Sequence, residues 1–298
     1  MTLAHAFEYR KPKTLAEAAS ILRDAGDGAR VLAGGTDLIG WIRDGFAQPS
    51  LLIDLKGIEG LDRIGAFEKA GRIRIGALAA FTDLIESREV REELPLLWEA
   101  ARSVASRGIR NRATPVGNIC SAVPCCDMGP PLLVLEAEVV VEGPEGERAV
   151  PIGDWFVGPR RTSLRRGEIV KAIDVPLPGN PHGGCYVKLG RYDGEDLAQA
   201  SVALLVLPGG ETRVAFGAVA PTPVRGERIE KLLRGKEPDE ALLAEAIAIL
   251  PREIAPIDDV RACKEYRGRM TEVMFERGLA AARARLRGEG PPYGTRLL

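Results

Sequence analysis

The sequence predicts an α+β protein made of two domains. Strand and helix patterns alternate over the first 55 residues, as in a small α/β unit. The chain beyond residue 182 begins instead with apolar strand patterns and ends in long helical patterns. Between the two parts, residues 177–181 (LPGNP) form a cluster of helix and strand breakers without periodicity. We therefore expect the chain to divide near residue 180.

The composition is that of an ordinary soluble globular protein, with 45% hydrophobic and 28% charged residues among 298. A formal net charge of -1 gives no electrostatic reason to expect nucleic acid or an anionic membrane as a partner. No stretch approaches the roughly 20 apolar residues of a membrane helix, and the start MTLAHAFEYRKPK lacks the apolar core of a secretion signal. Taking this start as the native one, we expect a cytoplasmic protein.

The cysteines and histidines do not indicate a disulfide framework or a metal site. Five cysteines at irregular spacing are an odd set for disulfide pairing. The two histidines, His5 and His182, are interpreted as solvated or loop residues. A zinc or iron site built on histidine is therefore not expected.

The first 55 residues divide into short elements. A polar strand is expected at residues 7–9. Thr14 and Glu17 have the spacing of a capping box, which predicts a helix that stops at Gly26. A buried strand at 31–33, a helix that opens at Thr36 and Asp37, and a strand at 51–55 complete the unit.

The middle of the chain mixes both patterns. Residues 72–75 alternate polar and apolar, like a half-buried strand. Thr82 is expected to cap a short helix, and a helical pattern covers residues 94–104. Residues 106–127 are expected to be irregular because they are rich in Arg, Asn, Pro, Gly and Cys. An apolar, β-branched run predicts a strand at 132–141, and a polar turn at 143–146 predicts a hairpin into residues 149–150.

After the breaker cluster the patterns become longer. Strands are expected at residues 185–189, 200–207 and 212–219, with a Pro-Gly-Gly turn at 208–210. The tail is expected to be helical at 240–250 and again, as one long helix, at 260–287. No internal repeat or low-complexity tract is found.

The segment Val31–Leu38 (VLAGGTDL) has the local order of an anion site: a strand, two glycines and a helix start. Gly34 and Gly35 let backbone amides approach a phosphate, and the helix N-terminus adds partial positive charge. Thr36 adds a hydroxyl. The pattern is not the G-x-G-x-x-G dinucleotide fingerprint, and taken alone it favours a plain tight turn capped by Thr36.

Residues 109–127 hold a second candidate site. Arginines at 107, 110 and 112 surround the turn Gly117-Asn118, and a basic loop with a glycine suits a pyrophosphate. Asp127 suits the hydroxyls or amines of ribose or adenine. A surface loop with solvated arginines explains the same residues, so this segment alone decides nothing.

A third segment, residues 186–203, places Lys188 and Arg191 before an acidic turn and an apolar strand. Taken alone, it is interpreted as an edge strand with solvated charges.

Five segments occur in an order and at a spacing that resemble one known family. They are AGGTDL at 33–38, IRNRATPVGNICSAVPCCD at 109–127, KLGRYDGEDLA at 188–198, VAPTPVR at 219–225 and DDVRACKEYR at 258–267. Together they resemble the medium, FAD-binding subunit of molybdenum hydroxylases such as xanthine dehydrogenase, carbon monoxide dehydrogenase, nicotinate dehydrogenase and 4-hydroxybenzoyl-CoA reductase. The resemblance covers nearly the whole chain.

The resemblance implies a fold and a cofactor, FAD. It implies an FAD-binding domain of the vanillyl-alcohol-oxidase (PCMH) type over residues 1–177 and a carbon monoxide dehydrogenase flavoprotein C-terminal-type domain over residues 182–290. It also implies cofactor-binding residues. The residues expected around the pyrophosphate are Val31, Leu32, Ala33, Gly34, Gly35, Thr36 and Asp37. The second phosphate loop is expected to supply Thr114, Val116, Gly117 and Asn118. Asp127 is expected to contact the adenosine half, Ile169 and Lys188 to lie near the flavin, and Leu197 to lie over the flavin ring.

Two positions depart from the family pattern. Relatives have a glycine where this chain has Val116, and a β-branched residue there resists positive φ and close approach to a phosphate. This raises the alternative that FAD binds more weakly or sits differently. Tyr192 replaces a frequent arginine, which would change the electrostatics around the flavin. With only two histidines, covalent attachment of the flavin through histidine is not expected.

Cys120, Cys125 and Cys126 give the pattern C-x4-C-C, which raises the question of an iron–sulfur cluster. The 4-hydroxybenzoyl-CoA reductase relatives carry a cluster on this subunit in an inserted cysteine-rich loop that this chain lacks. Adjacent cysteines rarely ligate one cluster together, and a fourth ligand would have to be the distant Cys185 or Cys263. Free thiols that pack as small hydrophobic side chains are the preferred interpretation, and no metal ligands are predicted.

The resemblance implies an electron-transfer function. A molybdopterin-binding large subunit would oxidise the substrate, a small subunit with two [2Fe–2S] clusters would pass the electrons on, and FAD on this chain would deliver them to an external acceptor such as NAD. No acid–base pair or nucleophile stands out, so no catalytic residue is predicted.

Two other functions stay open at this stage. One is a free-standing flavin oxidoreductase on the same fold, similar to UDP-N-acetylenolpyruvylglucosamine reductase. The other is a flavin-free scaffold subunit, suggested by Val116.

Overall fold

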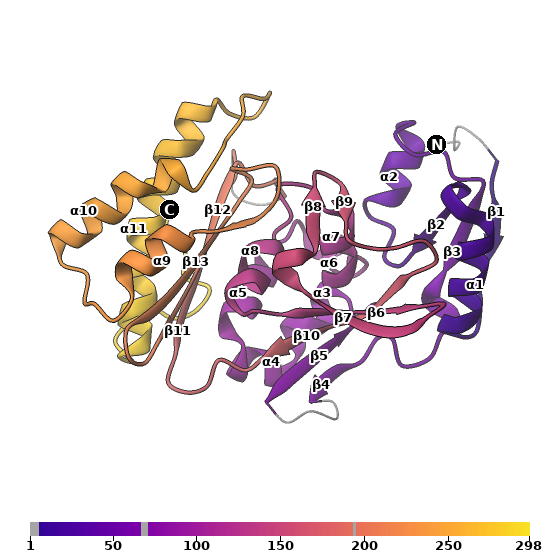
Figure 1. The fold of residues 1–298 in the computed structure, drawn as a ribbon, viewed down its shortest axis with the longest axis horizontal. Coiled ribbons are helices and arrows are strands. Elements are labelled where there is room, and N and C mark those ends of the chain that lie inside the picture. Colours follow the sequence, from indigo (N-terminus) through magenta and orange to yellow (C-terminus); the bar gives the residue numbers. More distant parts are fainter. Residues whose placement is uncertain (1–5, 67–70, 193–194) are drawn as a thin grey trace.

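The computed structural model describes residues 6–66, 71–192 and 195–298. Three sheets follow one another along the long axis of the molecule, each accompanied by helices (Figure 1). The N-terminal sheet lies at one end, a larger sheet occupies the middle, and the C-terminal sheet with its helices forms the other end. The predicted α+β class is confirmed.

The N-terminal unit is a parallel sheet of three strands in the order β1-β3-β2, covered by one helix. Its elements are β1 (Glu8–Arg10), α1 (Leu15–Ala25), β2 (Ala29–Leu32), α2 (Leu38–Arg43) and β3 (Leu51–Asp54). The Thr14 hydroxyl accepts the amide of Glu17 and caps α1, as predicted. The Glu17 carboxylate, however, accepts the amide of Lys13 rather than that of Thr14. Gly26 ends the helix with a φ of 57°.

The central sheet has five antiparallel strands in the order β4-β5-β10-β6-β7. They are β4 (Ile64–Ala66), β5 (Arg72–Gly76), β10 (Ile169–Pro176), β6 (Glu138–Gly143) and β7 (Gly146–Pro151). The predicted hairpin is the β6–β7 pair, closed where Gly143 faces Gly146. Arg74 and Asp174 face each other across β5 and β10, and the guanidinium donates two hydrogen bonds of 2.6 and 2.7 Å to the carboxylate.

Six short helices lie between β5 and β6 in the sequence. They are α3 (Phe81–Glu86), α4 (Arg88–Glu93), α5 (Pro95–Arg102), α6 (Arg107–Arg110), α7 (Pro115–Ser121) and α8 (Gly129–Val134). The described residues also form a small β8–β9 ribbon (Phe156–Gly158 and Arg161–Thr162) and 3-10 turns at Gly26–Gly28, Leu55–Gly57, Ile152–Asp154 and Leu250–Arg252.

Three local predictions for this region were wrong. Thr82 does not cap α3: the helix begins at Phe81, the carboxylate of Asp83 accepts the amide of the preceding residue Ala80, and the carbonyl of Ala113 accepts the amide of Phe81. Residues 106–127 are not irregular throughout, because they contain α6 and α7. The run at 132–141 is a strand only from Glu138 onward, and its first part is the end of α8. Two prolines in the first turn of α8 favour the helix there.

The C-terminal sheet is antiparallel, in the order β11-β12-β13-β14; of the three helices that follow it, α9 and α11 pack against the strands and α10 packs against those two helices. The elements are β11 (Gly183–Leu189), β12 (Ala200–Leu207), β13 (Glu211–Gly217), β14 (Val224–Arg225), α9 (Glu227–Leu233), α10 (Glu240–Ile249) and α11 (Lys264–Leu286). The predicted long helix therefore starts four residues later than expected. Val260, the expected first residue, lies in a loop with its side chain 97% exposed.

Strand β12 explains how the two parts of the chain share a core. All eight of its residues are buried, so both faces of the strand are covered. Ala203 and Leu205 point into the cluster formed with the central sheet and α5 and α8. Val202 and Leu204 point into a second cluster under α9 and α11. Because successive side chains of a strand point to opposite faces, one face of β12 packs in the first cluster and the other face packs in the second.

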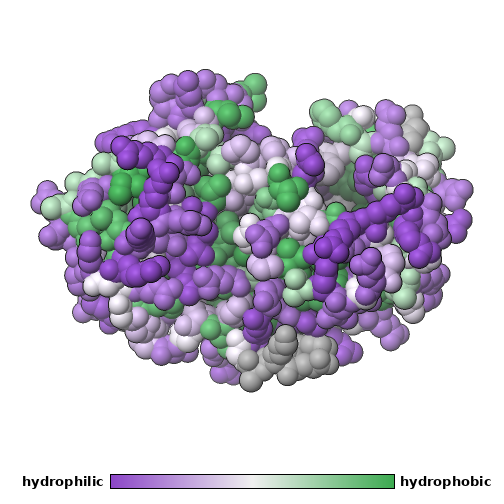
Figure 2. Space-filling model, in the orientation of Figure 1, coloured by the Kyte–Doolittle hydropathy of each residue, from purple (hydrophilic) through white to green (hydrophobic). Residues whose placement is uncertain are grey.

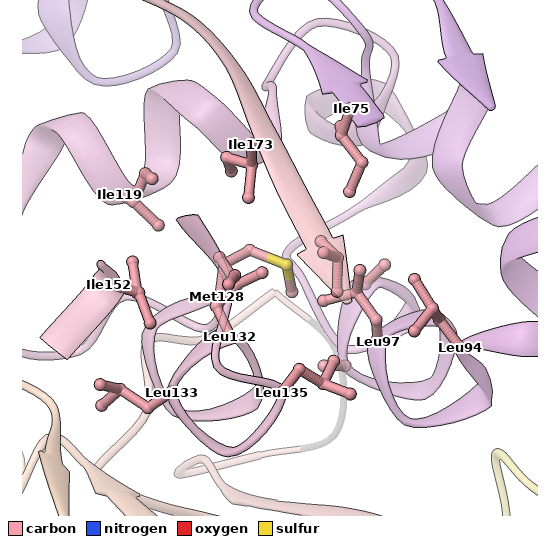
Figure 3. Packing of buried hydrophobic residues seen from close by; sticks show 14 of the residues in the cluster. Ile75, Leu94, Leu97, Ile119, Met128, Leu132, Leu133, Leu135, Ile152 and Ile173 are labelled. Atoms are coloured by element: carbon pink, nitrogen blue, oxygen red, sulfur yellow. The ribbon is translucent and has the colours of Figure 1, made fainter. Parts of the chain in front are cut away.

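The larger cluster is continuous from the central sheet to the C-terminal sheet. Figure 3 shows part of it, with Ile75 and Ile173 of the central sheet facing Met128 and the leucines of α5 and α8. Figure 2 shows one face of the molecule, largely hydrophilic and hollowed between the part that contains α2 and the C-terminal helices. None of the helices in the described part of the chain is both long and apolar enough to cross a bilayer.

Candidate functional site

A cavity of about 660 Å³ lies between the N-terminal unit and the middle part of the chain, and the segment after β11 lines one side of it. The turn after β2, the start of α7, the start of β10 and the segment after β11 all line it. Its size lies within the range of small-molecule and cofactor sites, and it combines apolar walls with a few polar groups.

The structure brings together nearly all the residues that the sequence singled out. The lining includes Val31, Ala33, Gly34, Gly35, Thr36, Asp37, Thr114, Val116, Gly117, Asn118, Asp127, Ile169 and Leu197. Two predicted residues do not line this cavity. Leu32 packs behind the glycine turn, with its Cδ1 3.0 Å from where a Cβ on Gly35 would lie. Lys188 lies behind Asp127 and borders a neighbouring cavity.

The two predicted loops meet at Gly34. A Cβ added to Gly34 would lie 2.0 Å from the backbone oxygen of Arg112, which is far inside van der Waals contact. Only glycine allows this approach. The neighbouring Gly35 has a φ of 81°, a conformation that other residues rarely adopt. Both glycines of the first motif are therefore required by geometry.

The first loop offers unused donors to the cavity. Among the hydrogen bonds of the described residues, none has the amide of Gly34, Gly35, Thr36 or Asp37 as its donor. The carbonyls of Gly35 and Asp37 are used instead, by the amides of Ile39 and Trp41, to start α2. Unpaired amides at a helix start suit a negatively charged ligand.

The second loop is a capped helix start. The hydroxyl of Thr114 accepts the amide of Gly117 at 2.8 Å, and Pro115 occupies the first helical position. Val116 follows with helical backbone and a buried side chain in the central core. The concern that a β-branched residue would resist a positive φ here is therefore wrong, because the position needs none.

A buried polar network lies behind the cavity wall. The carboxylate of Asp127 accepts a hydrogen bond from the Tyr186 hydroxyl at 2.9 Å and lies 3.0 Å from the Lys188 ammonium. Burial raises the pKa of Asp127, and the charge of Lys188 opposes that shift. Burial also raises the pKa of Tyr186 well above its usual value. Asp127 is thus held in place by two side chains of β11.

The wall between α5 and α6 carries backbone strain. Ala105 has a φ of 40°, which is uncommon for a residue other than glycine. The Arg110 guanidinium donates to the carbonyls of Val104 and Ala105 at 2.8 and 2.7 Å and holds this turn against the cavity. Sequence reasoning missed Val104, Ala105 and Tyr186, since no local pattern marks them.

Tyr192 and Leu197 form the exposed rim of the cavity, with 57% and 51% of their surface accessible. Between them, Asp196 accepts the amide of Arg191 at 2.6 Å and fixes the turn. Asp193 and Gly194 of the same motif lie outside the described residues.

The cysteines near the cavity are all free thiols. Cys120, Cys125 and Cys126 line the cavity, and burial raises the pKa of each thiol, that of Cys120 to about 12. Within residues 6–66, 71–192 and 195–298, no group of three or more His, Cys, Asp or Glu side chains is arranged to hold a metal ion. His5 lies outside these ranges.

Comparison with known proteins gives consistent results. Residues 5–178 match the family model described as the FAD binding domain in molybdopterin dehydrogenase, and residues 185–282 match the CO dehydrogenase flavoprotein C-terminal domain. The chain is 38% identical to the carbon monoxide dehydrogenase medium chain of Hydrogenophaga pseudoflava, over 94% of this chain and 98% of that protein. It is 32% identical to the xanthine dehydrogenase FAD-binding subunit of Escherichia coli, over 94% and 97%.

Solved structures of proteins named as dehydrogenases or oxidoreductases have the same fold as this chain. Carbon monoxide dehydrogenase from Hydrogenophaga pseudoflava superimposes with a TM-score of 0.91 at 37% identity, covering 96% of this chain and 99% of that one. Quinoline 2-oxidoreductase from Pseudomonas putida 86 gives 0.88 at 27% identity, covering 97% and 99%.

Proposed function

Since this chain belongs to the family of FAD-binding medium subunits of molybdenum hydroxylases, we propose that its cavity holds FAD for electron transfer within such a complex. The chain is an oxidoreductase subunit with an FAD-binding domain. In the proposal, electrons come from a [2Fe–2S] small subunit that is fed by a molybdopterin-binding large subunit. They leave to an external acceptor such as NAD.

The observation that carries the proposal is the meeting of the two loops at Gly34. It supports a pyrophosphate site because the amides of residues 34–37 have no acceptor among the described residues. The Thr36 hydroxyl and the amide of Val116, which has no acceptor among the described residues, add further donors beside them. A dinucleotide with two negative charges at its centre fits this donor set.

The remaining predicted residues take proposed roles around this point. Asp127 already accepts from Tyr186 and Lys188, and its remaining lone pairs would contact the adenosine half of the cofactor. Ile169 and Leu197 would pack near the flavin ring. Lys188 would not contact FAD and would instead hold Asp127 in position. In this proposal residues 1–177 bind FAD, and residues 182–290 close the cavity and support Asp127.

FAD supplies one-electron and two-electron transfer when it is bound. The chain itself needs no proton donor or nucleophile for that role. Its residues bind the phosphates, fix the ring through apolar contacts and keep water from the cavity walls.

A titration of the purified chain with FAD tests the proposal directly. The expected result is a flavin absorption spectrum that stays with the protein on gel filtration, with one FAD per chain. A chain that stays colourless after incubation with FAD would mean that the cavity does not bind the cofactor.

A further inference from the structure

Trp41 is the aromatic residue of α2, and its half-buried side chain lines the cavity proposed for FAD. It lies four residues, or about one helical turn, after Asp37, the last residue assigned to the pyrophosphate. Neither the sequence motifs nor the proposed phosphate contacts include it. The indole ring is therefore a part of the cavity wall that the phosphate contacts do not use.

The N–H group of Trp41 differs from those of the other two tryptophans. Trp98 donates its Nε1–H to the carbonyl of Ile85 at 3.0 Å, and Trp155 donates to the carbonyl of Ile119 at 3.0 Å. Among the hydrogen bonds of the described residues, none has Nε1 of Trp41 as its donor. Indole N–H groups usually find an acceptor when the ring is buried. Trp41 thus keeps an unused donor beside the cavity.

Arg160 covers one face of the Trp41 ring. Its guanidinium carbon lies 5.4 Å from the centroid of that ring and 5.8 Å from the centroid of the Phe46 ring. A guanidinium placed over aromatic rings is attracted to their faces and limits their movement. At most one face of the indole therefore remains for a ligand, and the ring that offers it is held in place.

Two uncommon backbone conformations place Arg160 over Trp41. Arg160 has a φ of 58° and Ala122, which ends α7, has a φ of 45°, although neither is a glycine. The amide of Arg160 donates to the carbonyl of Ala122 at 2.7 Å, so the two positions support each other. The neighbouring Ser121 hydroxyl donates to the carboxylate of Asp37 and joins the end of α7 to the glycine turn. Backbone strain of this kind is concentrated at ligand sites.

The exposure of the cavity wall indicates which half of the cofactor lies near Trp41. A cofactor that exchanges electrons with other molecules must hold its redox ring near the surface. Asp127, proposed for the adenosine half, is 6% exposed, whereas Leu197, proposed for the flavin, is 51% exposed. Helix α2 borders the hollow of Figure 2, and Phe46, which follows the helix, is 72% exposed. Trp41 therefore belongs to the open side of the cavity.

We propose that Trp41 contacts the isoalloxazine ring of FAD and that Arg160 is the positioning residue for Trp41. The inference rests on the proposed function and adds to it a residue that fixes the redox ring rather than the phosphates. An indole suits this role because it offers a large aromatic face and one N–H donor, and isoalloxazine offers an aromatic ring with acceptor atoms at its edge.

The test measures two properties of bound FAD, its dissociation constant and its fluorescence per bound flavin. An indole in contact with an excited flavin quenches the emission by passing it an electron, which then returns. Trp41→Ala should raise the dissociation constant about tenfold, because the ring contact is lost. Trp41→Phe, which keeps a ring, should raise it by no more than about threefold and should still increase the emission, because the indole is gone.

Trp98→Phe is the matched control. Trp98 is also half-buried and stacked, with the Arg102 guanidinium 4.6 Å from its centroid, but it does not line the cavity. Its replacement should leave the affinity for FAD and the emission unchanged. Arg160→Gln should increase the emission less than Trp41→Phe does, and Arg160→Lys, which retains a cation over the ring, should return it towards the wild-type value.

The two readouts separate the possible outcomes. Weaker FAD binding by Trp41→Ala without brighter flavin in Trp41→Phe would mean that Trp41 contacts another part of the cofactor, and the inference would be wrong. Unchanged affinity and emission in both variants would also overturn it, while the FAD assignment would stand. Wild-type emission from Arg160→Gln would remove the positioning role of Arg160. A chain that binds no FAD removes the basis of both proposals.

Discussion

The ammonium of Lys188 lies 3.0 Å from the carboxylate of Asp127 although the two residues are 61 positions apart in the sequence. Asp127 precedes α8 and lines the cavity proposed for FAD, whereas Lys188 belongs to the C-terminal sheet. Both side chains are nearly inaccessible to solvent. The pair therefore connects the proposed cofactor site to the other end of the molecule.

Lys188→Met should destabilise the protein by about 3 kcal/mol, because it leaves the carboxylate of Asp127 buried without its counter-charge. Urea denaturation measures the change. Lys171→Met is the control, since the Lys171 ammonium lies 2.6 Å from Glu147 in a half-exposed pair that should contribute no more than about 1 kcal/mol. Equal effects of the two substitutions would contradict this account of the buried pair.

Gly34→Ala should lower FAD affinity by about tenfold or more, because the new methyl group would overlap the backbone of Arg112 and separate the two loops. The dissociation constant can be measured by flavin fluorescence. Gly40→Ala, on the adjacent helix, has nothing within 4 Å of the added carbon and should leave FAD affinity unchanged. Normal FAD binding by Gly34→Ala would show that the loops do not form the phosphate site.

Val116→Gly, which introduces the glycine expected from the family resemblance, should not tighten FAD binding. It should instead destabilise the chain by about 3 kcal/mol, because it removes a buried side chain and places glycine in a helix. Thermal unfolding and FAD titration of the same sample test both statements. A variant that is equally stable and binds FAD tenfold more tightly would restore the concern raised by the sequence.

The stability of the protein should depend on pH through Cys185. Burial raises the pKa of this thiol to about 12 in the folded protein, above the ordinary value of 9.0. The unfolded chain therefore loses its proton first, so the contribution of Cys185 is intact below pH 9 and is lost as the pH rises towards 12. At pH 10 the loss should be about 1 kcal/mol. Unfolding free energies at pH 8 and pH 10 should fall less for Cys185→Ala than for the wild type; identical changes would refute the assignment.

Local signals accounted for much of the fold. The capping residue Thr14, the turn between β6 and β7 and the apolar run of β12 were recognised because each acts within a few residues. Helix α7 was missed although Thr114 followed by Pro115 is a good helix start. The basic and cysteine-rich composition around it was given more weight than that pair.

The parts of the site that could not be predicted depend on distant contacts. The role of Tyr186 follows only from its hydrogen bond to Asp127, 59 residues earlier. The strained turn at Ala105 is stable because Arg110 holds its carbonyl. Neither relationship leaves a periodic pattern in the chain, so the resemblance gave the position of the first cavity but not the structure of its walls.

The ion pair between Glu99 and Arg285 constrains the order of events during synthesis. The two residues are 186 positions apart, and the buried Glu99 also accepts the amides of Tyr186 and Gly294. A ribosome-bound chain that still lacks Arg285 has therefore no cation for this carboxylate, and α5 cannot complete its packing before Arg285 has been synthesised. A nascent chain stalled before residue 285 should be cleaved by protease near α5 much faster than the released protein.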